Sequence, residues 1–349
     1  MRLLIVLVNY HGHDLTIDCL KSLRPELAAL PEAKIGLCDN GSGPEEVQRL
    51  TTSIAAHGLG ERLDFVSVTP NQGFTGGNNE IIREAIASKS PPDSVLLLNN
   101  DTIVPEGAIQ KLVEFFEQHP EIAVCGSRLE YPDGETQRAA RRTLTWLSEI
   151  ESYARIGIVS RLLSRWVVAP PERNAPHVCG WVPGAALLIR REVLEKVGLL
   201  DEDLYTYFDD VDYCLRAKRA GWPTWYVPES RIVHLVGKTT GITSTDRRPK
   251  RRQSYWFWAR RHYFLKNFGP LHATLADMAA IMGLCLWKLR LLVGRKPNPD
   301  PPHLLTDLVR HSVLLTGYRI RPVENPVGSD KKTRTNIQLN ASMPTSTVS

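Results

Sequence analysis

The first hundred residues alternate short apolar runs with segments of helical periodicity, and this alternation limits the folds open to the chain. The apolar runs are LLIVLVNY, AKIGLCDN, LDFVSVTP and SVLLLNND, and helical patterns at about 15–30, 44–57 and 76–88 separate them. Short continuous apolar runs joined by helices are typical of parallel strands covered on both faces. The sequence therefore predicts an α/β fold, an open and mostly parallel sheet flanked by helices, with a ligand crevice beyond the carboxyl ends of the strands.

Polar residues follow each of these predicted strands, at positions 9–13, 39–42, 71–79 and 99–102. Loop polarity alone explains part of this pattern, but in LLLNND three polar residues follow directly on an apolar strand. The cluster NQGFTGGNNE opens a helix whose backbone amides suit a phosphate or an adjacent acceptor group. It is not GxGxxG, and no GxxxxGK[ST] occurs, so the sequence disfavours dinucleotide binding and P-loop hydrolysis.

Asp101 stands at the end of one predicted strand and is a candidate metal ligand. Such a carboxylate can bind Mg²⁺ or Mn²⁺ that bridges two phosphates, because these ions prefer carboxylate, phosphate and water oxygens. The alternative is an aspartate that caps the turn before Pro105. His234, in RIVHLVG, is either a core histidine or an imidazole that completes a metal site begun by a carboxylate.

Three carboxylates, Asp209, Asp210 and Asp212, begin a predicted helix. Acidic residues are favoured in a first helical turn, which gives a purely structural explanation. Carboxylates this close also repel one another, which raises the pKa of at least one of them unless a cation is near. Asp212 can pair with Arg216 at i+4, and this would leave Asp210 free to act as a general base.

The rest of the chain is less regular. Between about 120 and 180 the pattern predicts an irregular connection plus a helix, with arginines and tryptophans that contribute to acceptor binding. VPGAALLIRREVLEKVG predicts a strand that runs into a helix ended by Gly198, and TWYVPES predicts a further strand. Six scattered cysteines without a CxxC pair indicate reduced thiols in a cytosolic compartment, with no disulfide framework or zinc site.

The segment from Arg247 to Lys296 holds twelve Lys or Arg residues and one acid, Asp277. In 247–268 the basic residues are mixed with aromatic ones, as in RNA-binding segments, solvated helix faces and interfacial helices on anionic lipid. The stretch 269–293 is mostly apolar, but a proline, a histidine and an aspartate interrupt it. We favour peripheral attachment to an anionic membrane surface; the alternatives are a re-entrant or spanning helix and plain helix packing.

Six short motifs occur in order within roughly residues 3–240. They are VNY at 8–10, DNGS at 39–42, NQGFTGGNN at 71–79, LLLNNDT at 96–102, VPGAALLIRR at 182–191 and FDDVDYCLRAKRAGW at 208–222. Each motif alone is weakly specific, but the ordered set resembles the family 2 glycosyltransferases with the GT-A fold, especially the bacterial rhamnosyltransferase-like branch. The resemblance implies a nucleotide-sugar donor (dTDP- or UDP-sugar) and an inverting, metal-dependent sugar transfer.

The resemblance also implies roles for individual residues. Asp39 corresponds to the residue that contacts the donor's pyrimidine base, Asp210 to the general base, and Asp101 to the main ligand of Mg²⁺ or Mn²⁺. Asn99 replaces the first aspartate of the family's Asp-x-Asp motif, so His234 becomes the expected second metal ligand. The residues expected to bind the nucleotide-sugar are Val8, Asn9, Tyr10, Asp39, Asn71, Gly76, Asn78, Asn99, Asn100 and Asp101. On the acceptor and donor-sugar side we expect Trp181, Gly184 and Asp209.

The favoured function is transfer of rhamnose from dTDP-rhamnose to a glycan or polyprenyl-linked acceptor in cell-surface polysaccharide synthesis. Alternatives are the same chemistry with UDP-galactofuranose or a UDP-hexosamine, a noncatalytic glycan- or nucleotide-sugar-binding protein, and an RNA-binding protein, although we expect no nucleic-acid partner. We expect a catalytic domain at 1–240, a helical membrane-associating region at 241–324 and a disordered tail at 325–349. The enzyme is expected in the cytoplasm, peripheral on the cytoplasmic face of the membrane, and its oligomeric state stays open.

Overall fold

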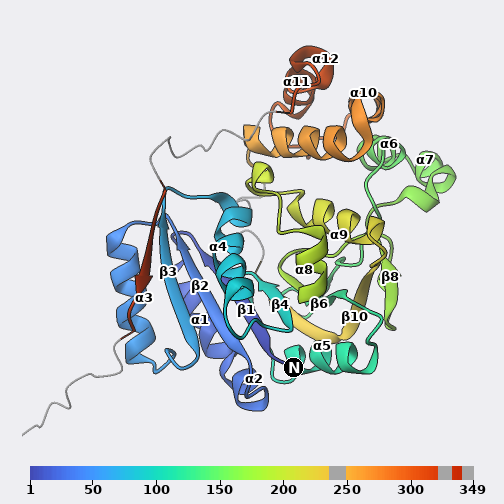
Figure 1. Cartoon of the computed structure of the whole chain (residues 1–349). Helices are drawn as coiled ribbons and strands as arrows, with labels where there is room; N and C mark the ends of the chain where they lie inside the picture. The colour runs from blue at the N-terminus through green and yellow to red at the C-terminus, as the bar shows by residue number, and fades with distance from the viewer. Residues whose placement is uncertain (236–248, 321–331, 340–349) are drawn as a thin grey trace, which may run out of the picture.

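The computed structural model describes residues 1–235, 249–320 and 332–339, and a mixed sheet lies at its centre (Figure 1). Its first four strands are β1 (Leu3–Asn9), β2 (Lys34–Asn40), β3 (Leu63–Thr69) and β4 (Ser94–Leu98). They run parallel in the order β3-β2-β1-β4, with Val8 opposite Cys38 and Ile5 opposite Leu96. The predicted α/β fold, an open sheet flanked by helices, is confirmed.

The sheet continues through a second set of strands with mixed directions. They are β5 (Thr102–Ile103), β6 (Val124–Glu130), β7 (Thr136–Gln137), β8 (His177–Cys179), β9 (Ala186–Arg190) and β10 (Thr224–His234). Beyond β4 the order is β9-β6-β10-β5, and β9 runs antiparallel to both β4 and β6. We predicted only an irregular connection plus a helix for 120–180, so the prediction was wrong at β6. Gly126 and Ser127 interrupt its apolar run, and the buried Ser127 hydroxyl bonds to the Ser230 hydroxyl of β10 at 2.8 Å.

Helices flank this sheet because each has one apolar face to bury (Figure 1). The helices of this part are α1 (His13–Ser22), α2 (Arg24–Ala29), α3 (Pro44–Ala56), α4 (Gly73–Ala87), α5 (Ala108–Gln118), α8 (Arg191–Val197), the 3-10 turn η2 (Glu202–Leu204) and α9 (Asp209–Arg219). In α5, for example, Ile109, Leu112 and Phe116 are buried at helical spacing. The single helix predicted from 15 to 30 is two helices, because Pro25 lacks the amide needed to continue the first.

A group of helices lies at one end of the sheet, at the top of Figure 1. Its members are α6 (Trp146–Ala154), α7 (Gly157–Leu162), η1 (Ser164–Trp166), α10 (Ser254–Val293), α11 (Leu304–Arg310) and α12 (Val313–Thr316). The helix α10 bends at Gly269, whose φ is 80°. The basic aromatic half before the bend is largely buried, including Arg260 and Tyr263. No helix in the three described ranges has the length and apolarity needed to cross a membrane.

The chain adds one strand near its end, β11 (Thr333–Ile337), which pairs antiparallel with β3. We predicted disorder for 325–349, and the prediction was wrong for 333–337; 325–331 and 340–349 lie outside the described residues. The polar sequence of this strand did not indicate order, because contacts with distant parts of the chain stabilise the strand. It completes the hydrogen bonds of an open sheet edge, and Lys332 and Arg334 form ion pairs with Glu80 of α4.

Candidate active site

Asn9 and Asp39 end neighbouring strands, and their buried side chains meet at the carboxyl edge of the sheet. Asn9 Nδ2 donates to Asp39 Oδ1 at 2.8 Å, and the Ser42 amide donates to Asp39 Oδ2 at 3.2 Å. Burial raises the pKa of the Asp39 carboxyl, and the hydrogen bonds from Ser42 and Asn9 oppose this rise. These bonds use two of the roughly four acceptor positions of a carboxylate, which leaves capacity for a donor on a ligand.

Asn71 ties the loop before α4 to the loops around it. Its Oδ1 accepts hydrogen bonds from Asn40 Nδ2 at 3.1 Å, from the Gly73 amide at 2.7 Å and from the Tyr205 hydroxyl at 3.0 Å. Gly73 has a φ of 71°, and a Cβ there would collide with the Tyr205 carbonyl. Only glycine fits this position without strain, so the loop is held at a fixed distance from the turn that carries Tyr205.

Four other residues predicted to bind the donor lie around the same edge. Val8 is half-buried at the end of β1, and the neighbouring Tyr10 is 36% exposed. Gly76 and Asn78 are buried in the first turns of α4. The side-chain Nδ2 of Asn78 donates to the Phe74 carbonyl of its own helix at 2.8 Å, so this group is bonded within the helix rather than presented to a ligand.

The three polar residues after β4 are fixed by bonds to separate parts of the chain. The Asn99 amide donates to the Ala185 carbonyl at 3.1 Å, and Asn100 Nδ2 donates to Thr16 Oγ1 at 2.9 Å. The Asp101 side chain is buried, with only 6% of it exposed. These contacts hold the Asn99–Asn100–Asp101 turn against both α1 and the segment before β9.

The side chains of Asp101 and His234 lie close together. His234 Nε2 lies 3.3 Å from Asp101 Oδ1 and 3.3 Å from Asn99 Nδ2. Across the ring, His234 Nδ1 lies 3.2 Å from Gln137 Oε1. Gln137 Nε2 donates to the carbonyls of Glu130 and His234, so its oxygen is the acceptor that faces the imidazole. This network assigns the proton to Nδ1 and leaves a lone pair on Nε2.

The donor set at Asp101 and His234 fits a divalent cation. With the proton on Nδ1, the facing atoms Nε2 and Oδ1 are both acceptors, and at 3.3 Å they repel unless a proton or a metal ion lies between them. Two adjacent ligands of an octahedral ion with bonds of about 2.1 Å stand about 3 Å apart. One carboxylate and one imidazole leave the other positions to the phosphate and water oxygens that Mg²⁺ and Mn²⁺ prefer.

The three carboxylates of α9 have different surroundings. Asp212 accepts from Arg216 Nε at 2.7 Å and from Lys266 Nζ at 2.9 Å, so the predicted pair within the helix is confirmed. Asp209 is buried beside Asp210, and burial together with the charge of Asp210 raises the pKa of Asp209. The cluster therefore contains one neutralised carboxylate and two neighbours that compete for ionisation.

Asp210 is held by backbone amides and forms no ion pair with a residue of the described ranges. Its Oδ1 accepts from the Val211 amide at 2.8 Å, and its Oδ2 accepts from the Gly184 amide at 3.3 Å. Burial raises the pKa of Asp210, while these amides and then the charge of Arg141 oppose the rise. A fixed carboxylate with a raised pKa is suited to general-base catalysis.

One short segment joins the metal-binding pair to the aspartates. The Ala185 carbonyl accepts a hydrogen bond from the Asn99 backbone amide. The backbone amide of the preceding residue, Gly184, donates to the Asp210 carboxylate. A Cβ at Gly184 would stand 3.4 Å from the Phe74 ring and 3.9 Å from Asp210 Cβ. These are ordinary van der Waals distances, so the segment lies directly against both α4 and α9.

Trp181 and Arg141 border the same segment. The Arg141 guanidinium lies 4.9 Å from the centre of the Trp181 ring, and the Trp181 indole donates to the Arg142 carbonyl at 3.0 Å. Sequence analysis did not identify Arg141, whose positive charge opposes the rise in the pKa of Asp210. It also did not identify Gln137 as the partner of His234. Both lie in the weakly periodic region before 180, where the run of arginines was the only signal.

The turn before α9 contains strained backbone. Tyr205, Tyr207 and Phe208 have positive φ values of 31°, 66° and 62°. Each such residue costs on the order of 1–3 kcal/mol and persists only where packing holds it. Tyr255 of α10 stacks on Tyr207 with ring centres 5.9 Å apart, and Trp256 meets Phe208 edge-on at 5.6 Å. The first half of α10 therefore supports the turn that positions the paired aspartates.

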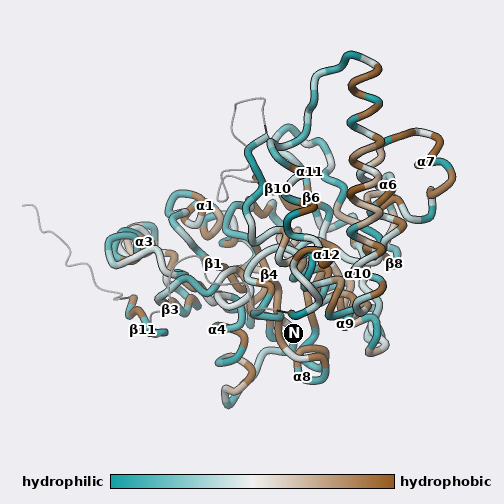
Figure 2. Tube along the Cα trace, turned by 90° about the horizontal axis from the view of Figure 1, so that it is seen from above, coloured by the Kyte–Doolittle hydropathy of each residue, from teal (hydrophilic) through white to brown (hydrophobic). Residues whose placement is uncertain are grey.

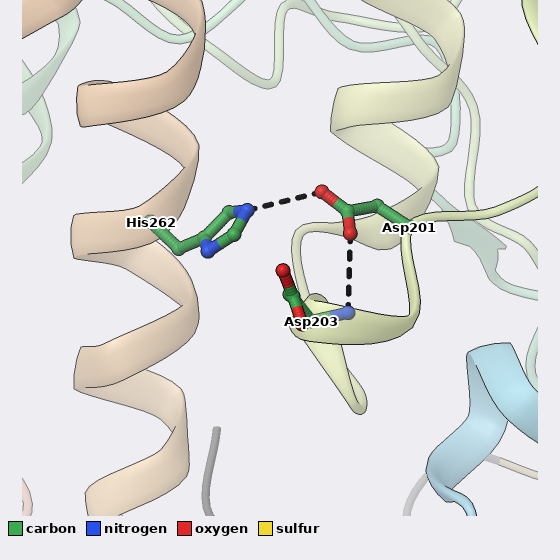
Figure 3. Close-up of side chains that lie close together, drawn as sticks. All are labelled: Asp201, Asp203 and His262. Carbon is green, nitrogen blue, oxygen red and sulfur yellow. Dashed lines mark hydrogen bonds and ion pairs between the residues drawn. The ribbon is translucent and has the colours of Figure 1, made fainter. Parts of the chain in front are cut away.

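A second acidic cluster lies where α10 meets η2 (Figure 3). Asp201, Asp203 and His262 offer ligand atoms that lie within 4.8 Å of one another. His262 Nε2 is 3.0 Å from Asp201 Oδ2, but Lys266 Nζ is 2.6 Å from the same oxygen. Burial alone would raise the pKa of Asp201, yet hydrogen bonds from His262 and Lys266 hold it well below its ordinary range. Because a lysine already supplies positive charge here, we interpret the cluster as an ion-pair network that ties α10 to η2.

Comparison with known proteins gives a consistent set of similarities. A family model described as "Glycosyltransferase like family 2" matches residues 2–255. The chain is 30% identical over 221 residues to N-acetylglucosaminyl-diphospho-decaprenol L-rhamnosyltransferase of Mycobacterium tuberculosis, covering 58% of this chain and 70% of that protein. It is 31% identical over 225 residues to dTDP-rhamnosyl transferase RfbF of Shigella flexneri, covering 62% and 68%.

The fold of this chain is also similar to that of a solved glycosyltransferase structure. The mannosyltransferase PcManGT from Pyrobaculum calidifontis, solved in complex with GDP-Man and Mn²⁺, superposes with a TM-score of 0.53. The superposition covers 91% of this chain and 81% of that chain at 14% sequence identity. At this identity the likeness bears on the arrangement of helices and strands alone.

Proposed function

Because this chain belongs to glycosyltransferase family 2 and has its GT-A-like fold, we propose that it transfers rhamnose from dTDP-rhamnose to a glycan or polyprenyl-linked acceptor. Family membership makes it a nucleotide-sugar glycosyltransferase; the donor sugar and the acceptor are the proposal. The names of two relatives support it, one a dTDP-rhamnosyl transferase and the other a rhamnosyltransferase for a diphospho-decaprenol-linked sugar. The product would enter cell-surface polysaccharide synthesis.

We place the donor along the carboxyl edge of the sheet, with its pyrimidine near Asp39 and its diphosphate near Asp101 and His234. These last two residues would hold Mg²⁺ or Mn²⁺, which neutralises charge on the departing nucleoside diphosphate when it is bound. Support comes from their two acceptor atoms facing each other at 3.3 Å and from Gln137, which fixes the imidazole tautomer. A neighbour of the same fold was solved with Mn²⁺.

Asp210 would remove the proton from the acceptor hydroxyl as that oxygen attacks C1 from the face opposite the leaving group. A single displacement of this kind inverts the anomeric configuration. The observation that carries the proposal is that Asp212 is neutralised by two cations while Asp210 is not, and that Asp210 is joined to the metal-binding side through Gly184 and Ala185. A carboxylate freed from ion pairs can accept a proton.

Other donors, UDP-galactofuranose or a UDP-hexosamine, would use the same groups. A noncatalytic sugar-binding protein would need no half-buried carboxylate without an ion-pair partner in the described residues, and so it explains Asp210 less well. We further propose that residues 1–240 form the catalytic domain and 241–324 a region that associates with the cytoplasmic face of the membrane.

The test is a transfer assay on the full chain with dTDP-rhamnose, Mn²⁺ and a polyprenyl-diphosphate-linked acceptor, in which released dTDP is measured. Asp210→Asn should slow transfer by about a hundred- to ten-thousand-fold, as loss of a general base does, while calorimetry shows nearly unchanged donor binding. Asp64→Asn, on an exposed position of β3, is the matched control. Near-normal turnover of Asp210→Asn would refute the assignment.

A further inference from the structure

The second half of α10 exposes an apolar stripe. Its members are three, four or seven positions apart, which places them on one face of the helix. They are Leu271, Met278, Met282, Leu289 and Leu292, with exposed fractions between 52% and 76%. The opposite face packs on α6, where a Cβ added to Gly283 would stand only 3.0 Å from backbone atoms of Ile150 and Ala154. The stripe is therefore the outward face of a helix that is otherwise well packed.

Two other helices of this group also expose apolar side chains. Ile158 and Leu162 of α7 are 68% and 75% exposed, and Leu314 and Leu315 of α12 are 55% and 67% exposed. Figure 2 shows the hydrophobic stretches of α10 and α7.

Hydrogen bonds fix both helices to α10. The Val313 amide, at the start of α12, donates to Asp277 Oδ2 at 2.7 Å. Arg290 donates to the Arg155 carbonyl, just before α7, at 2.9 Å. We name the exposed apolar side chains of α7, α10 and α12 together the α10 apolar surface.

Every acid in this group of helices is already occupied. In the described residues 144–166 and 249–320 there are five: Glu149 and Asp277 pair with Arg260, Asp300 with Arg155, and Asp307 with Arg251, while Glu151 accepts from the Ser160 hydroxyl. Cations of the same ranges that form no ion pair with a described carboxylate include Arg161, Arg165, Lys288, Arg295, Lys296 and Arg310. The net charge of this group of helices is therefore positive.

We propose that the α10 apolar surface docks on an anionic lipid membrane, with its apolar side chains among the acyl chains and its cations at the headgroups. An apolar face surrounded by Lys and Arg is the pattern of helices that lie in the membrane interface. The docking face is the second half of α10, not the mixed basic and aromatic stretch 254–268, because that stretch is largely buried against the catalytic domain.

Charge favours lipid over a second copy of the chain as the occupant. In a symmetric dimer through this face, the cations of one copy would lie against the same cations of the other. This is because both subunits contribute the same patch to a two-fold interface. Like charges brought together in this way cost free energy, whereas phosphate headgroups neutralise them.

The docked orientation has a consequence for the reaction, and this step rests on the proposed function. The first half of α10 supports the turn at Tyr205–Phe208 through Tyr255 and Trp256, and the second half carries the docking face. One bent helix thus fixes the distance between the membrane surface and Asp210. A lipid-linked acceptor would be presented to the base without leaving the membrane.

The test measures binding of the full chain to sedimented vesicles, with and without phosphatidylglycerol in phosphatidylcholine. We expect binding to the anionic vesicles only. The double variant Met282→Glu with Leu289→Glu should lower the partition coefficient by about tenfold or more, since two leucine-sized side chains no longer enter the lipid. The pair Arg295→Glu and Lys296→Glu should lower it as well, and added salt should weaken wild-type binding.

The control is Val178→Glu on β8, an apolar residue 49% exposed on another part of the chain. Thermal unfolding of every variant guards against loss of fold. Equal binding to neutral vesicles, wild-type binding by either double variant, or a solution dimer that Met282→Glu with Leu289→Glu dissociates would overturn the proposal. The vesicle assay contains no sugar donor and is independent of the transfer assay. If the chain binds anionic vesicles but shows no activity in the transfer assay, the membrane-docking proposal stands and the proposed function is rejected.

Discussion

At the scale of single residues, the Gln137 amide decides which imidazole nitrogen of His234 can bind a cation. It accepts the proton of Nδ1, and its own nitrogen is anchored to two backbone carbonyls. Gln137→Leu should weaken Mn²⁺ binding by about ten- to a hundred-fold, the usual loss when such a supporting group is removed. Calorimetric titration of Mn²⁺ in the presence of dTDP measures it.

Gln48→Leu, on the exposed face of α3, is the control for Gln137→Leu. A purely structural role for Gln137 would lower the unfolding temperature and leave the affinity for Mn²⁺ unchanged, and that result would contradict the prediction.

The surroundings of Asp210 predict a pH dependence. Burial raises its pKa and the charge of Arg141 opposes the rise, so protonation at low pH disables the base earlier than it would an ordinary aspartate. We expect kcat/KM to fall on the acid side with a midpoint above the pKa of an ordinary aspartate. Removing the positive charge in Arg141→Gln should move that midpoint further up.

The control is Arg138→Gln, whose guanidinium bonds to the Ala169 carbonyl and is not among the main influences on the pKa of Asp210. The measurement is the pH dependence of kcat/KM for the wild type, Arg141→Gln and Arg138→Gln. An identical acid limb in the wild type and in Arg141→Gln would remove Arg141 from the site.

Part of this site was predictable from the sequence and part was not. Asp212 with Arg216 follows from helical spacing, and Asp101 with His234 from the family resemblance. Gln137 and Arg141 were not predictable, because their positions depend on how β6 pairs with β7 and on the bonds of Arg141 to Trp181. Such pairings join residues whose local sequence has no distinctive pattern.

At the scale of elements, the contact between α6 and α10 depends on a buried charge cluster. Arg260 donates to Glu149 at 2.6 Å and also pairs with Asp277, and its side chain is 4% exposed. Arg260→Met would leave two carboxylates buried without a cation, which costs on the order of 3–5 kcal/mol of unfolding free energy. Denaturant unfolding followed by circular dichroism measures it.

Arg310→Met, at an exposed position of α11, should stay within about 0.5 kcal/mol of the wild type. If Arg260→Met unfolds at the wild-type denaturant concentration, the cluster contributes no net stability. The same cluster explains why the basic stretch was hard to interpret from sequence. Arg260 is an internal counterion, and Arg251 pairs with Asp307 although its own side chain is 54% exposed.

At the scale of the whole molecule, the parallel half was predictable and the mixed half was not. Strands β1 to β4 are continuous apolar runs separated by helices, and that pattern implies parallel pairing. Strand β9 inserts antiparallel between β4 and β6, a choice made by contacts between distant segments. The helical group likewise combines α6, from the middle of the chain, with α10, so its members are contiguous in space and not in sequence.

The pairing of β11 with β3 has a consequence for the order in which the molecule can be completed. Thr333 lies 264 residues after Thr69, the residue it faces. On a ribosome the chain emerges from its N-terminal side onward, so the edge of β3 stays open while the residues between the two strands are made. The nascent protein would expose this strand edge until Thr333–Ile337 emerge and close it.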